Sequence, residues 1–74
     1  MQKINDFIEV HSQVNDGKII CLNVNDITAV GTYEDNKHKV TTILIIKGWD
    51  KGTLPVNETY TEVMKKMFGE GYGQ

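Results

Sequence analysis

Three side chains in this sequence are soft or borderline metal ligands: His11, Cys21 and His38. A three-residue turn at 15–17 would place His11 opposite Cys21 across a hairpin, whereas a two-residue turn would place Ser12 there. Even the first register supplies two ligands where a structural zinc site needs four. We therefore expect no metal site. We interpret Cys21 as a small buried apolar residue and His11 as a half-exposed strand residue.

The same His11 and Cys21 have the residue types of a Cys–His nucleophilic dyad. Such a dyad requires an exposed thiolate, a cleft and an oxyanion hole. Cys21 lies between Ile20 and Leu22, and these apolar neighbours are typical of a core position. We expect no catalytic residue and a protein that is not an enzyme.

The segment 48–53 resembles a phosphate-binding loop only superficially, through its closing Lys51, Gly52 and Thr53. The Gly-x-x-x-x-Gly-Lys-Ser/Thr order of such loops is broken here, and no long helix follows at once. The sequence therefore predicts no cofactor and points to no small-molecule substrate.

A basic loop with one aromatic residue is formed by Lys47, Trp49 and Lys51. An aromatic ring between two cations is the minimum that could stack a base and contact phosphate. Asp50 subtracts charge, however, and all eight cationic residues of the chain are lysines, which lack the bidentate geometry of arginine. Nucleic-acid binding is therefore the second hypothesis for this loop. The first is contact between Trp49 and a protein partner.

Length and composition indicate one small domain over residues 1–74, with ends at 1–6 and 69–74 that we expect to be flexible. The 74 residues carry a net charge of -2, and a chain of this size forms a thin core with little room for a deep active site. The single cysteine excludes an intrachain disulfide, which favours a reducing compartment. No signal peptide and no apolar run of about 20 residues is present, so we expect a soluble, cytoplasmic protein without membrane contact.

Strands dominate the predicted elements, since 8 Ile, 7 Val and 7 Thr fall in short runs between polar turns. Alternating polarity predicts strands at 7–14, 18–22, 27–34 and 39–47. A turn or single helical turn is expected at 23–26, and a short edge strand with Pro55 at 53–56. The strand at 39–47 is apolar on both faces, as expected for a central or doubly covered strand.

One helix is expected after Val56, with Asn57 or Thr59 as its N-cap and Gly69 at its end. Its apolar residues recur at helical spacing and must dock on the sheet, because three turns are marginal alone in water. The predicted fold is therefore α+β: an antiparallel meander of four to five strands with one C-terminal helix packed on it. The alternative is that the meander curls into a partial barrel.

The apolar surface of the strand at 39–47 exceeds what one helix covers. We therefore expect a protein partner, with self-association as a homodimer favoured. The predicted contact residues are the outward pair Ile43 and Ile45, rimmed by Trp49 with Lys47 and Lys51.

Two segments carry a family resemblance: Gly-Lys-Ile-Ile-Cys-Leu-Asn at 17–23 with Asn-Asp-Ile at 25–27, and Leu-Pro-Val-Asn-Glu-Thr-Tyr-Thr-Glu-Val-Met-Lys-Lys-Met at 54–67. This order resembles the FlbD-like family of small bacterial flagellar proteins. The resemblance implies a compact meander with a C-terminal helix and an accessory role in protein assembly. The 48–52 loop and the first strand depart from the family. The layout is also similar to LytTR DNA-binding domains, whose basic recognition residues this chain mostly lacks.

Overall fold

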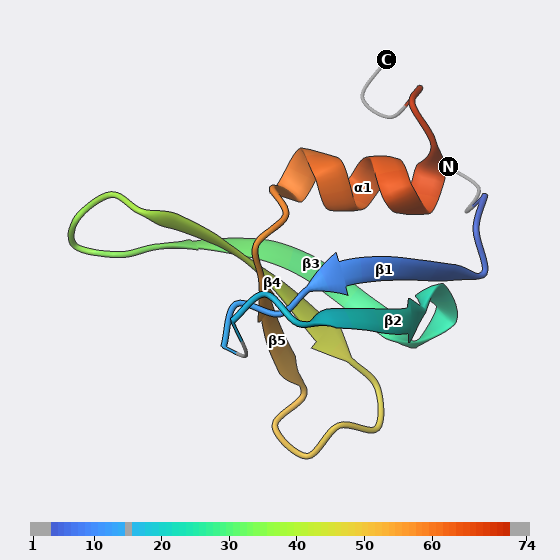
Figure 1. Ribbon diagram of the computed structural model, residues 1–74, viewed down its shortest axis with the longest axis horizontal. Coiled ribbons are helices and arrows are strands. Elements are labelled where there is room, and N and C mark those ends of the chain that lie inside the picture. The colour runs from blue at the N-terminus through green and yellow to red at the C-terminus, as the bar shows by residue number, and fades with distance from the viewer. Residues whose placement is uncertain (1–3, 15, 72–74) are drawn as a thin grey trace.

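A computed structural model describes residues 4–14 and 16–71 of the chain. The elements run in the order β1 (Phe7–His11), β2 (Ile19–Asn23), the 3-10 helix η1 (Val24–Asp26), β3 (Ile27–Glu34), β4 (Val40–Ile46), β5 (Thr53–Val56) and α1 (Tyr60–Phe68). They form an antiparallel β1–β2 hairpin, a three-stranded β3–β4–β5 sheet and one helix (Figure 1), which confirms the predicted α+β class. The sheets do not close into a barrel. Among the described residues, one isolated bridge, Ser12–Val56, joins them.

The first hairpin differs from both predicted registers. His11 pairs with Ile19 and Glu9 pairs with Cys21, so His11 and Cys21 are not opposite one another. β1 also ends at His11 instead of Val14, which is 68% exposed. The hairpin register continues to Ser12, whose N–H donates to the carbonyl of Lys18, and a wider turn than the predicted one closes the hairpin. Ser12 also forms an isolated bridge with Val56 of β5.

The three-stranded sheet follows the predicted meander. β4 is central, between β3 and β5, and Pro55 pairs with Ile43 on one side, while on the other side its carbonyl accepts the N–H of Gln13. The turn after β3 is built by Asp35, whose side chain accepts hydrogen bonds from the backbone N–H groups of Lys37 and Lys39. The predicted polar turn is therefore confirmed, and it carries the β3–β4 hairpin away from the body of the molecule (Figure 1).

The core lies between the inner faces of the two sheets and is closed by α1. Its members are the buried side chains of Ile8, Val10, Leu22, Val24, Ile27, Leu44, Ile46, Leu54, Val56, Val63 and Met67. α1 lies alongside β1 and also contacts β3, so it covers the open side between the sheets (Figure 1). Val63 and Met67 point inward at helical spacing, as the apolar pattern of the segment predicts.

Of the two candidate N-caps, the structure selects Thr59. Its hydroxyl accepts a hydrogen bond from the N–H of Glu62, and the Glu62 carboxylate accepts one from the N–H of Thr59. This reciprocal capping box satisfies two donors at the start of α1. Gly69 ends the helix at a φ of 96°, as expected for a glycine C-cap.

The N-terminal residues 4–6, expected to be part of a flexible end, make backbone contacts with the body of the protein. The N–H of Ile4 donates to the carbonyl of Met67, and the N–H of Val24 donates to the carbonyl of Asp6. Residues 1–3 and 72–74 of the predicted flexible ends lie outside the described residues. No helix within residues 4–14 and 16–71 has the length and apolar character to span a membrane.

Candidate functional site

The predicted contact residues Ile43 and Ile45 lie on the side of β4 that faces away from the core. Ile43 is partly exposed and Ile45 is 43% exposed, whereas their neighbours Leu44 and Ile46 are buried. This difference follows from the alternation of side chains along a strand, with the inner set against α1 and the β1–β2 hairpin. The predicted outward pair is therefore found on one surface.

The neighbours of this pair form an uncharged surface, here called the outer face: Ala29 and Gly31 of β3, Ile43 and Ile45 of β4, and Thr53 and Pro55 of β5. The strand registers place Gly31 and Pro55 on either side of Ile43, and Ala29 and Thr53 on either side of Ile45. The outer face therefore has a ridge of two isoleucines next to a row of two small residues.

The other three predicted contact residues, Lys47, Trp49 and Lys51, lie in the segment between β4 and β5. Trp49 is 42% exposed, and both lysine side chains are exposed without an ion pair among the described residues. The N–H of Lys47 donates to the carbonyl of Asp26 at 2.7 Å, which fixes the start of this segment beside η1. The basic loop is thus anchored at the end of the outer face.

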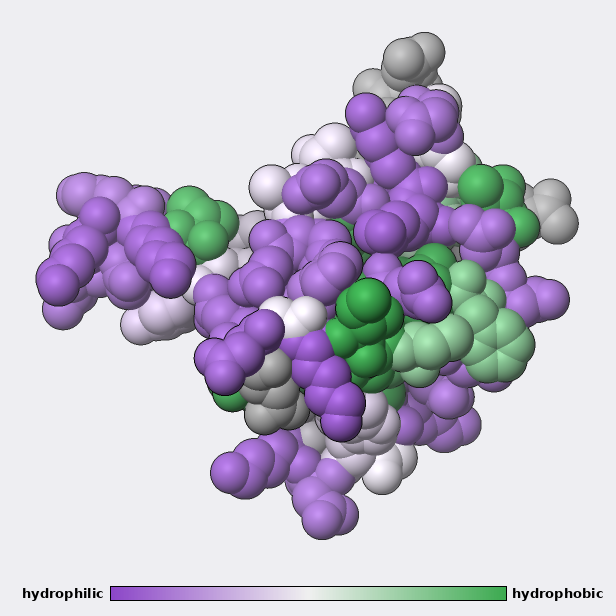
Figure 2. All heavy atoms as spheres, in the orientation of Figure 1, coloured by the Kyte–Doolittle hydropathy of each residue, from purple (hydrophilic) through white to green (hydrophobic). Residues whose placement is uncertain are grey.

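A second exposed apolar surface, which the sequence analysis missed, lies on the outward side of the β1–β2 hairpin. It is here called the hairpin strip and consists of Phe7, Ile19 and Cys21. Phe7 is 59% exposed, Ile19 is 56% exposed, and the Cys21 thiol is also exposed. Figure 2 shows hydrophobic atoms gathered over this hairpin among hydrophilic ones. The interpretation of Cys21 as buried is wrong, because Cys21 lies opposite Glu9 on the outward face of the hairpin, while the core packs against the other face.

His11 is held by a residue that the sequence analysis did not connect with it. The buried carboxylate of Glu58 accepts the backbone N–H of His11 through both oxygens, at 2.9 and 3.1 Å, and lies 2.7 Å from Nδ1. Burial alone would raise the pKa of Glu58, but the hydrogen bonds from the His11 ring and N–H lower this pKa below its ordinary value. No local pattern signals a contact across 47 positions.

This His11–Glu58 pair does not assemble a metal or nucleophilic site. Cys21 lies on a different pair of the hairpin, and His38 is bonded to Glu34 at the far end of the β3–β4 hairpin. Within the described part of the chain, no group of three His, Cys, Asp or Glu side chains is arranged to hold a metal ion. The contact instead joins the end of β1 to the start of the β5–α1 linker.

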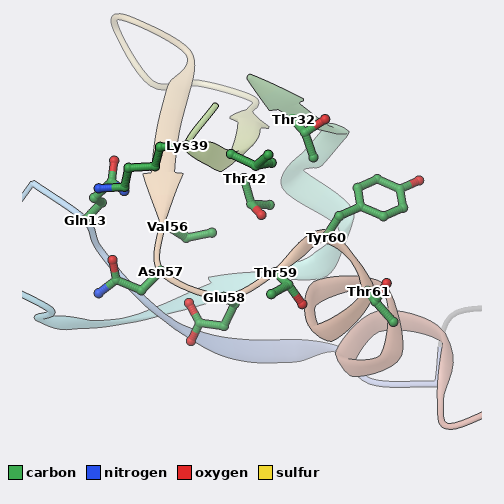
Figure 3. A pocket seen from close by; sticks show the side chains of 11 residues that line it. Gln13, Thr32, Lys39, Thr42, Val56, Asn57, Glu58, Thr59, Tyr60 and Thr61 are labelled. Carbon is green, nitrogen blue, oxygen red and sulfur yellow. The ribbon is translucent and has the colours of Figure 1, made fainter. Parts of the chain in front are cut away.

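A third surface, here called the polar recess, is a cavity of about 420 Å³ beside the N-terminal end of α1. The inner faces of the sheet strands form its floor, with Thr32, Thr42 and Val56. The linker and first helical turn form its wall, from Asn57 to Thr61, and Lys39 and Gln13 lie at its mouth. In Figure 3 the Thr42 hydroxyl points toward the middle of this ring of side chains.

Comparisons with protein-family models, curated proteins and solved structures find no match to this chain. The FlbD-like and LytTR-like resemblances therefore stay predictions, and the candidate surfaces must be judged by their own chemistry.

Proposed function

We propose that this chain is a non-catalytic protein-binding module that associates with a second copy of itself through the outer face. The observation that carries the proposal is the partial exposure of Ile43 and Ile45 on a surface without a charged side chain. Depletion of charge at the centre of a surface patch is typical of interfaces.

The shape of the outer face favours a second copy of the chain as the partner. A two-fold axis parallel to the strands, lying in the interface above the line between β3 and β4, would place the Ile43–Ile45 ridge of one copy over Ala29 and Gly31 of the other. Such an isologous contact needs one self-complementary surface, and a ridge beside a row of small residues is self-complementary.

The size of the outer face sets the expected strength. Three strands spaced about 4.8 Å apart, with about five residues at about 3.4 Å each, give a patch of roughly 15 by 17 Å. This patch is well below the roughly 800 Å² per partner of a standard interface, even with Tyr33 and Trp49 at its rim. We therefore expect a weak dimer that dissociates on dilution into the micromolar range.

The test compares two isoleucines of similar exposure on the two apolar surfaces. Ile45→Lys introduces a charge into the outer face, and Ile19→Lys introduces the same charge into the hairpin strip. Light scattering after size exclusion should give wild type and the Ile19 variant a mass approaching twice 8.4 kDa at high concentration, and the Ile45 variant the monomer mass. Circular dichroism checks that both variants keep their secondary structure.

A strictly monomeric wild type at millimolar concentration would refute self-association. Survival of the dimer in the folded Ile45 variant, or its loss in the Ile19 variant alone, would instead refute the outer face as the interface.

The second candidate function, nucleic-acid binding, is favoured by the exposure of Trp49 between Lys47 and Lys51. Binding through this loop would weaken steeply with added salt, since each neutralised phosphate releases counterions. Filter binding of single-stranded oligonucleotides at low and moderate salt tests it, with Trp49→Ala as the variant. Absence of binding at low salt would remove this candidate.

A further inference from the structure

The side chain of Thr42 is largely buried, and its hydroxyl faces the polar recess (Figure 3) without a hydrogen-bond partner among the described residues. Thr42 is 3% exposed and occupies the inward side of β4, in line with the core residues Leu44 and Ile46. No hydrogen-bond partner of its Oγ1 is present among residues 4–14 and 16–71. A hydroxyl that opens into a recess and makes no bond within the fold is free to bond to a molecule that enters the recess. A ligand in the recess would supply the missing acceptor.

The charges around the recess indicate which ligand. Lys39 lies at its mouth and makes no ion pair with any described residue, so an ammonium group is available. The first turn of α1 forms part of the wall, and the N-terminal end of a helix carries partial positive charge. The capping box occupies the N–H of Glu62.

One acidic residue, Glu58, also lines the recess and opposes an anion. Both oxygens of its carboxylate already accept hydrogen bonds from His11, which lies on the other side of the linker. These hydrogen bonds stabilise the ionised carboxylate from outside the recess without neutralising it. Lys39 and Glu58 are the charged residues that line the recess, and Glu58 is already bonded to His11. The Lys39 ammonium is therefore the charged group available to a ligand.

We propose that the polar recess binds a small oxyanion, a carboxylate or phosphate group, with the Thr42 hydroxyl donating at the floor and Lys39 supplying the opposite charge at the mouth. The volume of about 420 Å³ falls within the range of small-molecule sites, so the oxyanion can belong to a larger molecule. This site is on the inner side of β4, independent of the outer face.

The test is a titration of the ¹⁵N-labelled full chain, at a concentration where it is monomeric, with sodium phosphate and with sodium acetate. Sodium chloride at matched ionic strength is the reference for salt effects. We expect saturable shifts of the amide signals of Thr42, Thr59 and Thr61. Saturation by one salt alone identifies phosphate or carboxylate as the preferred group, and saturation by neither overturns the proposal.

Two pairs of variants locate the site. Thr42→Val removes the hydroxyl with little change in shape, and Thr41→Val makes the same change on the opposite face of β4. Lys39→Gln removes the charge at the mouth, and Lys37→Gln removes a charge from the turn. Loss of one hydrogen bond should weaken binding about five- to tenfold in the Thr42 and Lys39 variants and leave the two controls near wild type.

The Thr42→Val variant should unfold at about the same urea concentration as wild type, because the hydroxyl makes no hydrogen bond within the described residues. Unchanged stability together with weaker binding is the combination that a ligand-directed hydroxyl predicts. Unchanged binding in this variant overturns the proposal. If the variant does not fold, unchanged binding in Lys39→Gln overturns it equally.

Discussion

The carboxylate of Glu58 takes the place of a strand partner for His11. In a continuing antiparallel ladder, the N–H and the C=O of His11 would both bond to Asn57. Only the carbonyl does so, accepting the N–H of Asn57 at 2.9 Å, while the N–H donates to Glu58. The β1–β5 pairing thus ends after one bridge. The buried carboxylate of Glu58 accepts the His11 N–H in place of the backbone carbonyl that a longer ladder would supply.

Removal of the Glu58 carboxylate should destabilise the fold more than removal of the His11 ring. Glu58→Ala leaves the His11 N–H without an acceptor and should cost about 2–3 kcal/mol, whereas Glu58→Gln keeps one acceptor oxygen and should cost about 1 kcal/mol. His11→Gln keeps the backbone donor, and the ring is half exposed, so its cost should stay below about 1 kcal/mol. Urea unfolding measures all three, and an equal loss in the Ala and His11 variants would contradict this account.

Stability should depend on pH through Glu58. Because its pKa in the folded chain is below the ordinary value of 4.5, its ionisation stabilises the fold fully above that value. This contribution is lost as the pH falls from 4.5 through the lower folded pKa. Glu58→Gln should therefore flatten the acid limb of a stability-against-pH curve. Glu9→Gln, an exposed change of the same charge, serves as the control, and an identical curve for both variants would refute the assignment.

The capping box at the start of α1 should contribute measurably to stability. Thr59→Ala removes the hydroxyl that accepts the Glu62 N–H and should cost about 1 kcal/mol, or a melting temperature lower by about 4–8 °C for a chain of this size. Thr61→Ala lies one position inside the helix and makes no capping bond, so it is the matched control. Equal effects of the two substitutions would show that the box is not stabilising.

Ser12→Ala should stabilise the protein. Ser12 is fully buried, and its Oγ has no hydrogen-bond partner within the described residues. The substitution removes an unsatisfied polar atom and leaves a space no larger than that oxygen, so we expect a gain of about 1 kcal/mol. Chemical denaturation against wild type measures it. A loss of stability would reveal a partner for this hydroxyl.

The Cys21 thiol should react with a maleimide or an aromatic disulfide reagent in the folded protein without prior unfolding, since it is exposed on the hairpin strip. Association through the outer face leaves this strip uncovered. The reaction rate should therefore be the same below and above the concentration at which the dimer forms. Slower labelling at high concentration would identify the hairpin strip as the interface instead.

Much of the secondary structure could be predicted from the sequence because its signals are local. Alternation defined the strands, and Asp35 with its neighbours defined the turn after β3. The Thr59–Glu62 spacing likewise offered the capping box as one of two possible starts of α1. The outward position of Ile43 and Ile45 followed from the same alternation, since a strand has two faces and β4 must turn one of them to the core.

Register and long-range pairing were decided only by the tertiary structure. The β1–β2 hairpin is shifted by two residues from the register expected for a three-residue turn, so Cys21 lies opposite Glu9 instead of His11. Cys21 is exposed because the core packs against the other face of this hairpin, which carries Ile8, Val10 and Leu22. The contact between His11 and Glu58 and the placement of Thr42 at the floor of the polar recess also join segments far apart in the chain. Their energies depend on burial, which composition and spacing do not specify until the two sheets and α1 have packed together.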